Sequence, residues 1–428
     1  MRVAFHTLGC KVNQNDTDSL AQLFRQRGHD IVPFEPGVDI YIINTCVVTQ
    51  LGEKKSRQIV HKAVGYQPKL VVVTGCYPQV SPEEAAAISG VDLVIGMAER
   101  PRIVELVEET LEKHEKLARV NKIEALTDWV SLPVSIEGER TRANLKIEEG
   151  CDQFCSYCII PYARGPVRSM PVAQVVKEIK TLLEAGYKEI VLSGIHLGAY
   201  GKDIGADLNT VLTSILNIET EFRIRLGSLE PVDLTDKLIE TVVNHPKVCQ
   251  YLHIPLQSGS ESILKRMNRD YTLQDYASLL RKLRAGNPQI AIGTDLIVGF
   301  PGETAEDFVS TCNFIADQFL SKIHVFRYSP RKGTPAAGFA NRVSKAVQEE
   351  RSKTIAAIAA EMNFNYMRQF VGNTVSVLFE ESSAKTWSGF TGEYIRMEVA
   401  TDQELRNTLK QVLVTGVQQN NLVGKIID

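Results

Sequence analysis

The chain has 428 residues, 44% of them hydrophobic and 23% charged, a composition that excludes a disordered or fibrous protein and predicts two or three globular domains. The formal net charge of −3 excludes a general basic surface, so any contact with nucleic acid must be local. No apolar run approaches the roughly 18–20 residues of a membrane-spanning helix, and the N-terminus lacks a signal-peptide pattern. We therefore expect a cytoplasmic protein with no membrane partner and with reduced cysteines.

The first 120 residues alternate short apolar runs with helical segments, which predicts a parallel α/β domain. The expected strands are RVAFHTLG, DIYIINT, KLVVVTG and VDLVIG, and the expected helices cover 17–27, 50–64 and 102–117. The alternation stops near residue 118, and Pro133 and Gly138 follow, so we interpret 121–141 as a linker.

A second alternating series occupies 142–344. Its expected strands are NLKIEEG, EIVLSGIH, EFRIRLGSLE, YLHIPLQ, AIGTDLIVG and KIHVFRYS, and its expected helices cover 171–184, 209–217, 235–244, 261–285 and 304–319. Six such units predict an open, partial (β/α)6 barrel rather than a full barrel of eight. Barrel enzymes place their chemistry at the C-terminal ends of the strands, so we expect the site there.

The C-terminal part differs in pattern. An amphipathic segment runs over 345–370, and we assign 345–365 to a connecting helix. The runs VGNTVSVLFEE, WSGFTGEYIRMEVA, QVLVTGVQ and LVGKIID then predict a small antiparallel β-barrel over 366–428. This last domain has six basic and seven acidic residues, so any RNA contact there must use a local patch.

Three cysteines, Cys151, Cys155 and Cys158, form a C-x3-C-x2-C run after the first barrel strand. Structural zinc needs four ligands, whereas a cubane iron–sulfur cluster held by three cysteines keeps one iron open to a substrate or cofactor. A zinc loop with a distant fourth ligand, or three buried thiols, are the alternatives.

Cys10, Cys46 and Cys76 each end an expected strand of the first domain. Because the C-terminal ends of parallel strands share one edge, their placement predicts a second site of three thiolates. The alternative is that they are small buried hydrophobic residues. We expect Cys249 and Cys312 to be packing residues.

Seven motifs together identify a family: HTLGCKVNQNDTDS, IINTCVVT, VVTGCYPQ, GCDQFCSYCIIPYARG, LHIPLQSGSESILKRMNR, DLIVGFPGET and YSPRKGTPAA. Across nearly the whole chain it resembles the radical S-adenosylmethionine methylthiotransferases. The resemblance implies a second-cluster domain over 1–120, a radical S-adenosylmethionine barrel over 142–344 and an RNA-binding TRAM-like domain over 366–428. LGCKVNQN and RIRLGSLEP are most similar to the branch that modifies N6-threonylcarbamoyladenosine (t6A) at position 37 of tRNA.

The resemblance also implies the chemistry. The enzyme is expected to convert C–H to C–S–CH3 at C2 of t6A37, with two [4Fe–4S] clusters and with S-adenosylmethionine as both radical source and methyl donor. The C-x3-C-x2-C cysteines would hold the radical cluster and the other three the sulfur-presenting cluster. The implied partners are the tRNA anticodon stem-loop, an electron-donating reductase or flavodoxin-like protein and a sulfur donor. Alternative substrates are isopentenyladenosine-37 of tRNA and a ribosomal-protein aspartate, and a zinc-stabilised RNA-binding adaptor is the alternative of another class.

The resemblance places further residues around S-adenosylmethionine, at its adenine, ribose and methionine ends. These are Tyr157, Gly194, Glu230, Gln257, Ser258, Ile297 and Gly299. We expect Glu303 to act as a helix N-terminal charge and not as a ligand. His6 and His196 flank strand ends, and we assign no role to either.

Recognition of an anticodon loop uses basic residues for phosphates and aromatic rings for unstacked bases. Basic residues that could rim the barrel mouth are Arg164, Arg168, Lys265, Arg266, Arg269, Arg327, Arg331 and Lys332. In the C-terminal domain the aromatic–cation pairs to test are Tyr394 with Arg396 and Trp387 with Lys385.

Overall fold

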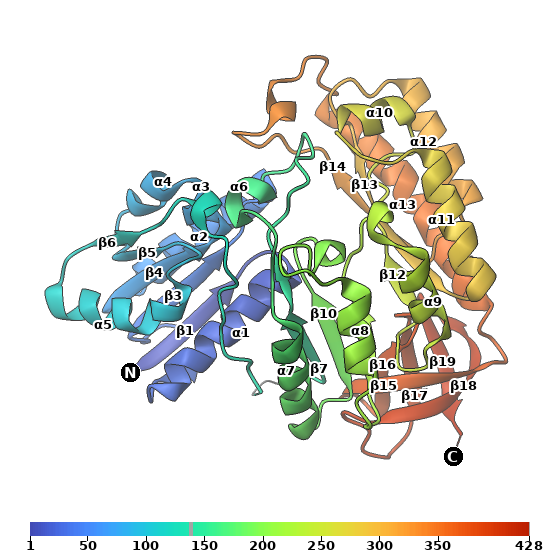
Figure 1. Ribbon diagram of the computed structural model, residues 1–428, viewed down its shortest axis with the longest axis horizontal. Helices are drawn as coiled ribbons and strands as arrows, with labels where there is room; N and C mark the ends of the chain where they lie inside the picture. Colours follow the sequence, from blue (N-terminus) through green and yellow to red (C-terminus); the bar gives the residue numbers. More distant parts are fainter. Residues whose placement is uncertain (137–139, 428) are drawn as a thin grey trace.

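The computed structural model describes residues 1–136 and 140–427, so residues 137–139 of the expected linker lie outside it. Figure 1 shows three parts in chain order: a parallel sheet with helices, an open β/α barrel, and a small closed β-barrel that contains the C-terminus. The expected fold class is confirmed. Within the described residues, no helix is long and apolar enough to cross a membrane.

The N-terminal sheet is parallel and has six strands in the order β2-β1-β3-β4-β5-β6. The strands are β1 Arg2–Thr7, β2 Asp30–Val32, β3 Ile40–Thr45, β4 Leu70–Gly75, β5 Leu93–Ile95 and β6 Leu117–Arg119. The helical segments are α1 Lys11–Gln26, α2 Gln50–Gly65, α3 Cys76–Val80, α4 Pro82–Ala86, η1 Arg100–Arg102, α5 Ile103–Lys113 and η2 Ile123–Ala125. Strands β2 and β6 were not expected, because each edge strand is only three residues long and too short to show a pattern.

Helices cover both faces of this sheet. Every residue of β3 and β4 is buried, and alternate residues of β3 enter two different apolar cores. A strand buried on both faces reads as a continuous apolar run, which is why these two strands were recognisable in the sequence. The sheet therefore holds the C-terminal ends of its central strands in fixed positions.

The barrel consists of two parallel three-stranded sheets, β7-β10-β11 and β12-β13-β14, joined by bridges from Ile224 to Val248 and from Ser228 to His253. Its strands are β7 Arg142–Lys146, β10 Glu189–Ser193, β11 Arg223–Leu226, β12 Tyr251–His253, β13 Ala291–Val298 and β14 Lys322–Arg327. The short strands β8 Glu148–Glu149 and β9 Arg168–Ser169 form a separate antiparallel pair. Its helical segments are α6 Ile160–Arg164, α7 Val172–Glu184, η3 Leu197–Ala199, α8 Leu208–Leu216, η4 Pro231–Asp233, α9 Asp236–Asn244, α10 Glu261–Arg266, α11 Leu273–Gly286, α12 Ala305–Asp317 and η5 Pro335–Gly338.

The expected single helix over 261–285 is wrong. Asn268 has a left-handed backbone with φ 59°, which ends α10, and Thr272 forms a capping box with Asp275 that starts α11. The break places the loop between the two helices, including Arg269, over the cysteine loop, where Asn268 donates to the carbonyl of Phe154 at 3.0 Å.

Helix α13, Lys345–Arg368, leads into the closed barrel. The strands of this barrel are β15 Thr374–Ser383, β16 Thr386–Thr391, β17 Arg396–Ala400, β18 Leu409–Gln418 and β19 Asn421–Ile426, in the order β15-β16-β17-β19-β18. All neighbours are antiparallel except β17 and β19, which are parallel. Its core includes Tyr251 and Ala291, at the first residues of β12 and β13, so the small barrel closes the N-terminal end of the larger one.

Candidate active site

The first three cysteines lie at the C-terminal ends of adjacent strands. Cys10 follows β1 and precedes α1, Cys46 follows β3, and Cys76 begins α3 directly after β4. Cys10 is exposed, whereas Cys46 and Cys76 are buried. Burial, together with the charges of Cys76 and Cys10, raises the pKa of Cys46 to about 11. The three thiols therefore share one edge of the sheet.

Asn13 connects the three cysteine loops. Its Nδ2 donates to the carbonyls of Leu8 at 2.7 Å and Thr45 at 2.9 Å, and its Oδ1 lies 4.0 Å from the Sγ of Cys76. This residue sits in the first turn of α1, which begins at Lys11 rather than at the expected residue 17. The role of Asn13 was not predicted, because a buried polar residue interrupts the helical spacing of apolar residues by which a helix is recognised in a sequence.

Arg164 reaches the same thiols from the barrel. It belongs to α6, just after the C-x3-C-x2-C loop, is fully buried, and its Nε donates to the Sγ of Cys76 at 3.3 Å. It also contacts the Asn13 Oδ1 and the carboxylates of Asp16 and Glu149. One side chain thus connects the loop of one cysteine set with a thiol of the other.

The carboxylates that hold Arg164 belong to a buried ionic network. Asp16 also accepts from Arg100 at 2.7 Å and Lys146 at 2.5 Å. Burial alone would raise the pKa of Asp16, but Arg100, Lys146 and Arg164 together lower it below its usual range. The network joins α1 to β7 and α6, so it fixes the N-terminal sheet against the barrel.

The second three cysteines lie on the loop after β8. The Nη1 of Arg269 donates to the Sγ of Cys155 at 3.2 Å, and the backbone N–H of Ile160 donates to the Sγ of Cys158 at 3.4 Å. Burial, together with the charge of Cys155, raises the pKa of Cys158 to about 12. The three thiols lie within one loop.

His196 lies beside this loop. Its Nδ1 is 3.7 Å from the Sγ of Cys151, and its Nε2 is 2.6 Å from the Oδ2 of Asp233. The carboxylate therefore orients the imidazole toward the thiol. His6, in contrast, packs against Phe34 with ring centroids 5.1 Å apart.

Two of the residues expected around S-adenosylmethionine lie close to this cysteine loop. Gly194 follows β10, and a Cβ there would lie 2.4 Å from the Oε2 of Glu148. The position therefore has no room for a side chain, and only glycine fits. Glu230 forms an ion pair with Arg269, the residue that donates to Cys155. Glu230 thus positions the guanidinium of Arg269, which donates to the Sγ of Cys155.

The other expected residues lie on or beside β13. Gln257 has a left-handed backbone with φ 65°, accepts from the N–H of Ile297 at 2.9 Å, and precedes the buried Ser258. Ile297 is half-buried. Tyr157 packs against Phe300 with ring centroids 6.5 Å apart. These residues surround the C-terminal end of β13.

Gly299 and Glu303 follow β13. The N–H of Gly299 donates to the Oε1 of Glu303 at 3.0 Å, and a Cβ on Gly299 would lie 2.2 Å from the Cγ of Gln348 in α13. Glu303 is buried and pairs with Arg351, also in α13. The expected role of Glu303 as a helix N-terminal charge is therefore wrong, because its carboxylate connects this loop to α13.

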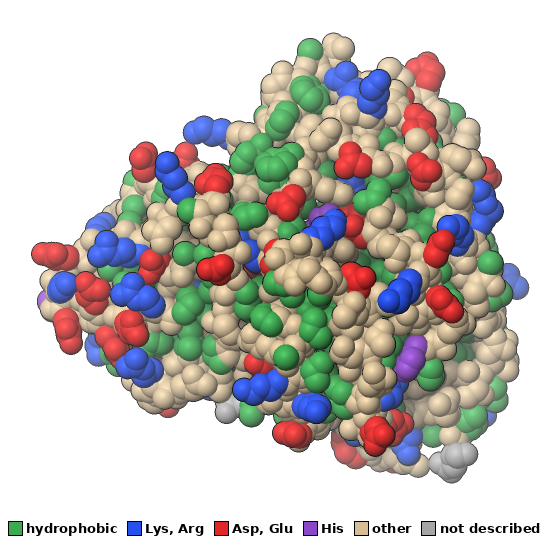
Figure 2. Space-filling view, viewed as in Figure 1, with side chains coloured by type: hydrophobic (Ala, Val, Ile, Leu, Met, Phe, Trp, Pro, Cys, Tyr) green, Lys and Arg blue, Asp and Glu red, His purple; other side chains and the backbone are tan. Residues whose placement is uncertain are grey.

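The expected basic rim is only partly present. Lys265, Arg266, Arg327 and Lys332 are exposed. The other four arginines are bound to groups of the protein itself. Arg164 has the contacts described above, and Arg168 donates to the carbonyls of Leu126, Pro166 and Arg164. Arg269 forms an ion pair with Glu230, and Arg331 forms one with Glu53. Figure 2 shows acidic and basic side chains interspersed over one face of the molecule.

The expected aromatic–cation pairs of the small barrel are wrong. Arg396 donates to Glu381 at 2.7 Å, and Lys385 pairs with Asp402 at 3.0 Å. Trp387 belongs to the core of the small barrel. The ring of Tyr394 instead faces cations of the larger barrel and of α1: Arg225, Arg142, Lys11 and Lys322.

The two remaining cysteines are packing residues. Cys249 is buried, and Cys312 packs against the main barrel core. All eight cysteines are free thiols.

Both cysteine sets fit an iron–sulfur cluster by their chemistry. One set supplies three thiols from the ends of adjacent strands, and the other supplies three thiols from one loop. N–H donors lie beside sulfur atoms of both sets, and such hydrogen bonds tune the potentials of clusters. Among residues 1–136 and 140–427, no three His, Cys, Asp or Glu side chains lie close enough to hold a single metal ion. A cubane cluster is larger than one ion and binds each cysteine at a different iron.

Comparison with known proteins identifies the family of this chain. Residues 145–315 match the Radical SAM superfamily, and residues 2–96 match the family described as Uncharacterized protein family UPF0004. The threonylcarbamoyladenosine tRNA methylthiotransferase of Bacillus subtilis is 41% identical over 96% of this chain and 93% of its own length. The chain belongs to the radical S-adenosylmethionine methylthiotransferase family. The protein is therefore an enzyme, a methylthiotransferase, and its cofactors are S-adenosylmethionine and [4Fe–4S] clusters.

More distant relatives carry other names. The tRNA-2-methylthio-N(6)-dimethylallyladenosine synthase of Pseudothermotoga lettingae is 35% identical over 93% of this methylthiotransferase and 92% of its own length. The ribosomal protein uS12 methylthiotransferase of Geobacter sulfurreducens is 34% identical over 100% of this chain and 98% of its own length. Among solved structures, the radical S-adenosylmethionine methyltransferase TsrM of Kitasatospora setae has a TM-score of 0.60 and 13% identity, covering 84% of this chain and 89% of its own, a likeness of fold alone.

Proposed function

We propose that this enzyme methylthiolates C2 of N6-threonylcarbamoyladenosine at position 37 of tRNA. The observation that carries the proposal is the contact between Arg164 and Cys76, which puts the two three-cysteine sites on either side of one short helix. A substrate carbon between the two sites is accessible to both. The bound cofactors would supply radical removal of the C2 hydrogen and delivery of sulfur and a methyl group.

The proposed roles of the thiols follow from their loops. Cys151, Cys155 and Cys158 hold the cluster that binds S-adenosylmethionine, because they lie at the C-terminal ends of the barrel strands. Cys10, Cys46 and Cys76 hold the second cluster. Arg269 and Arg164 donate to one sulfur of each set, and both guanidinium groups are held by carboxylates, so their N–H groups stay aimed at sulfur.

The cofactor-binding residues are part of the same proposal. The adenine would be bordered by the ring of Tyr157 and by Ile297 and Gly299. The ribose would contact Gln257 and Ser258, and the methionine end would contact Gly194. Glu230 acts through Arg269 and orients it toward Cys155, so its contact with S-adenosylmethionine is secondary.

The partners belong to the proposal as well. We propose that residues 1–120 and 142–344 carry the chemistry and that 366–428 contribute to binding the anticodon stem-loop. An electron-donating reductase or flavodoxin-like protein and a sulfur donor complete the reaction, because the chain itself supplies neither electrons nor sulfur beyond its clusters.

Relatives with three substrates match this chain, and the identities favour t6A. The two relatives with 41% and 38% identity are both named for t6A, whereas those named for dimethylallyladenosine and the ribosomal protein have 35% and 34%. Two other relatives named for t6A also have 35% and 34% identity. Isopentenyladenosine-37 and a ribosomal-protein aspartate are the alternative substrates.

The test is a reaction with three purified substrates under anaerobic reducing conditions. The reconstituted enzyme is incubated with S-adenosylmethionine, sulfide and an anticodon stem-loop carrying t6A, a stem-loop carrying isopentenyladenosine, or ribosomal protein S12. Mass analysis of the digested products should show the methylthio group on t6A. A methylthio group on either of the other substrates, with t6A unchanged, would overturn the proposal.

A further inference from the structure

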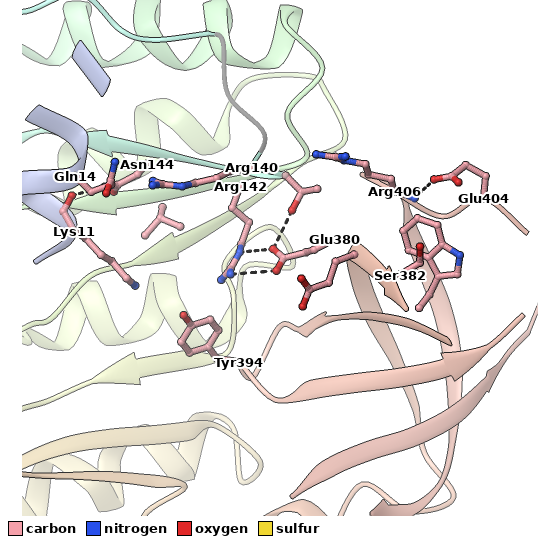
Figure 3. A pocket seen from close by; sticks show the side chains of 14 residues that line it. Lys11, Gln14, Arg140, Arg142, Asn144, Glu380, Ser382, Tyr394, Glu404 and Arg406 are labelled. Atoms are coloured by element: carbon pink, nitrogen blue, oxygen red, sulfur yellow. Dashed lines mark hydrogen bonds and ion pairs between the residues drawn. The ribbon is translucent and has the colours of Figure 1, made fainter. Parts of the chain in front are cut away.

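Two cavities differ in the charge of the residues that line them. The cavity in Figure 3 has a volume of about 710 Å³ and lies between α1, β7 and the small barrel. It is lined by cations and carboxylates together, among them Arg142, which donates to Glu380. A second cavity, of about 470 Å³, lies beside the C-x3-C-x2-C loop, and its described lining contains Lys265 and Arg266 but no carboxylate. The second cavity is therefore positively charged, which favours an anionic ligand.

This second cavity, the Phe154 cavity, adjoins the cysteine loop on both sides of Cys155. Phe154 and Ser156 line it, together with Asn268 from the end of α10. Asn268 donates to the carbonyl of Phe154 at 3.0 Å, and the Oγ of Ser156 donates to the carbonyl of Arg266 at 2.8 Å. These hydrogen bonds hold the loop against α10, so the cavity has a fixed place next to one of the thiols.

The ring of Phe154 is exposed to solvent. Its exposed fraction is 55%, and that of the neighbouring Tyr162 is 37%. The two ring centroids lie 5.8 Å apart at an interplanar angle of 71°. An edge-to-face contact covers at most one face of one ring, so Phe154 keeps a face free. Contiguous exposed apolar side chains indicate a binding surface, and an exposed aromatic face beside cations is a platform on which nucleobases stack.

The two cations are available to a ligand. In the part of the chain that the structure describes, neither Lys265 nor Arg266 forms an ion pair with a carboxylate. The Nε of Arg266 donates to the carbonyl of Pro301 at 3.1 Å, and its Cζ lies 5.4 Å from the ring centroid of Phe339, another lining residue. Arg266 is therefore held at the cavity wall, and the exposed Lys265 precedes it on α10.

We propose that the Phe154 cavity binds one unstacked base of the anticodon loop, from a nucleotide next to position 37. The base stacks on Phe154, and Lys265 and Arg266 bind its phosphate. This inference rests on the proposed function, and it adds a second point at which the loop is held. Phe154 directly precedes Cys155, so a base in this cavity is a neighbour of the base that reacts. Bases of single-stranded loops can be splayed apart, and an anchored neighbour orients the reacting base.

Equilibrium binding to stem-loops that lack one base tests the proposal without turnover. The cluster-reconstituted full-length enzyme, without reductant, is titrated into fluorescent t6A stem-loops that are intact or abasic on the 5′ or the 3′ side of position 37. Wild-type enzyme should bind one of the two abasic stem-loops about tenfold more weakly than the intact one, the effect expected for one base stacked on an aromatic ring. Equal binding of all three would overturn the proposal.

Variants of Phe154 assign the effect to its ring. Phe154→Leu should bind the intact stem-loop about tenfold more weakly and should bind the sensitive abasic stem-loop as wild type does, because ring and base interact with each other. Phe154→Tyr keeps an aromatic face and should bind as wild type does. Phe364→Leu, at an exposed ring on α13, is the matched control and should change no affinity. Weakening of intact and abasic stem-loops by the same factor in Phe154→Leu would overturn the proposal.

The salt dependence of binding tests the phosphate contact separately. Lys265→Gln should lower the slope of log K against log salt concentration by about 0.7, the change expected for one phosphate of a single strand. Lys180→Gln, in an exposed position on α7, is the matched control and should leave the slope unchanged. An unchanged slope in Lys265→Gln would overturn the proposed phosphate contact.

Further readouts keep the outcomes distinct. Iron content is measured for each variant, because Phe154 adjoins Cys155; if Phe154→Leu loses iron, the abasic stem-loops with wild-type enzyme and the slope of Lys265→Gln decide. Methylthiolation of the intact t6A stem-loop by wild type is measured in parallel. Product without dependence of binding on the neighbouring bases would remove only the base site, whereas base-dependent binding without product would remove only the proposed function.

An electron-donating protein is the other occupant to test. Reduction of Phe154→Leu by a flavodoxin is compared with that of wild type, and we expect equal rates. Slower reduction, together with wild-type affinity for every stem-loop, would assign this surface to the electron donor and overturn the proposal.

Discussion

Individual side chains decide how the cysteines are presented. Arg164 and Arg269 each donate to one sulfur, and each is held by a carboxylate on another element. In the sequence neither arginine stands out from surface residues, because Arg164 lies between Ala163 and Gly165 and Arg269 lies between Asn268 and Asp270. Only the fold shows that Arg164 is fully buried and that its charge is used inside the protein.

Replacement of Cys155 by Ala tests the radical site. A cubane cluster with one open iron needs all three cysteines, so Cys155→Ala should lose about half of the roughly eight irons expected for two clusters and should not cleave S-adenosylmethionine. Anaerobic iron and acid-labile sulfide determination, with chromatography of 5′-deoxyadenosine, measures both. Cys249→Ala is the matched control, because that buried thiol lies outside both sets and should retain iron and cleavage. Cleavage at the wild-type rate in Cys155→Ala would contradict the assignment.

At the scale of elements, the joint between α1, β7 and α6 is the feature that aligns the two cysteine sets. It consists of Asp16 and Glu149 with three buried cations. Removing the partner of a buried carboxylate strongly lowers the free energy of unfolding, whereas removing a surface ion pair changes it little.

Arg164→Met should therefore lower the free energy of unfolding of the apo-protein by about 3–5 kcal/mol. Arg102→Met is the control, because Arg102 pairs with Glu99 and Glu105 while 59% exposed, and should cost less than about 1 kcal/mol. Urea unfolding followed by circular dichroism compares the two. Equal shifts of the first unfolding transition would show that the joint contributes no more than a surface pair.

Much of the element order was predictable, because buried parallel strands such as β3 and β4 read as apolar runs and helices such as α7 and α9 have a clear apolar face. The edge strands β2 and β6 were not predictable, since three residues carry no period. The start of α1 was hidden by the buried polar residues Asn13 and Asp16, and the split between α10 and α11 depends on one left-handed residue, Asn268. The grouping of Cys10, Cys46 and Cys76 was predicted from strand ends and that of the other three cysteines from their spacing. The side chains that contact the thiols were not predictable, because Arg164 and Arg269 are distant in sequence from the cysteines that they contact.

At the scale of the whole molecule, the small barrel closes one end of the partial barrel and the N-terminal sheet lies against its open side (Figure 1). This arrangement leaves a lumen with cysteine sites at one end and the ring of Tyr394 at the other. The lumen surroundings of Tyr394 were not predictable, because its four cations lie on four different elements.

The central claim is that the two cysteine sets have separate tasks on one substrate, and Cys46→Ala tests it most directly. The variant is incubated anaerobically with reductant, S-adenosylmethionine and the t6A stem-loop, and 5′-deoxyadenosine and the methylthio nucleoside are quantified in the same sample. We expect cleavage of S-adenosylmethionine near the wild-type rate, about half the iron, and no methylthio product, because the radical site is intact and the second site is broken. Full iron content together with full methylthio product would contradict the account.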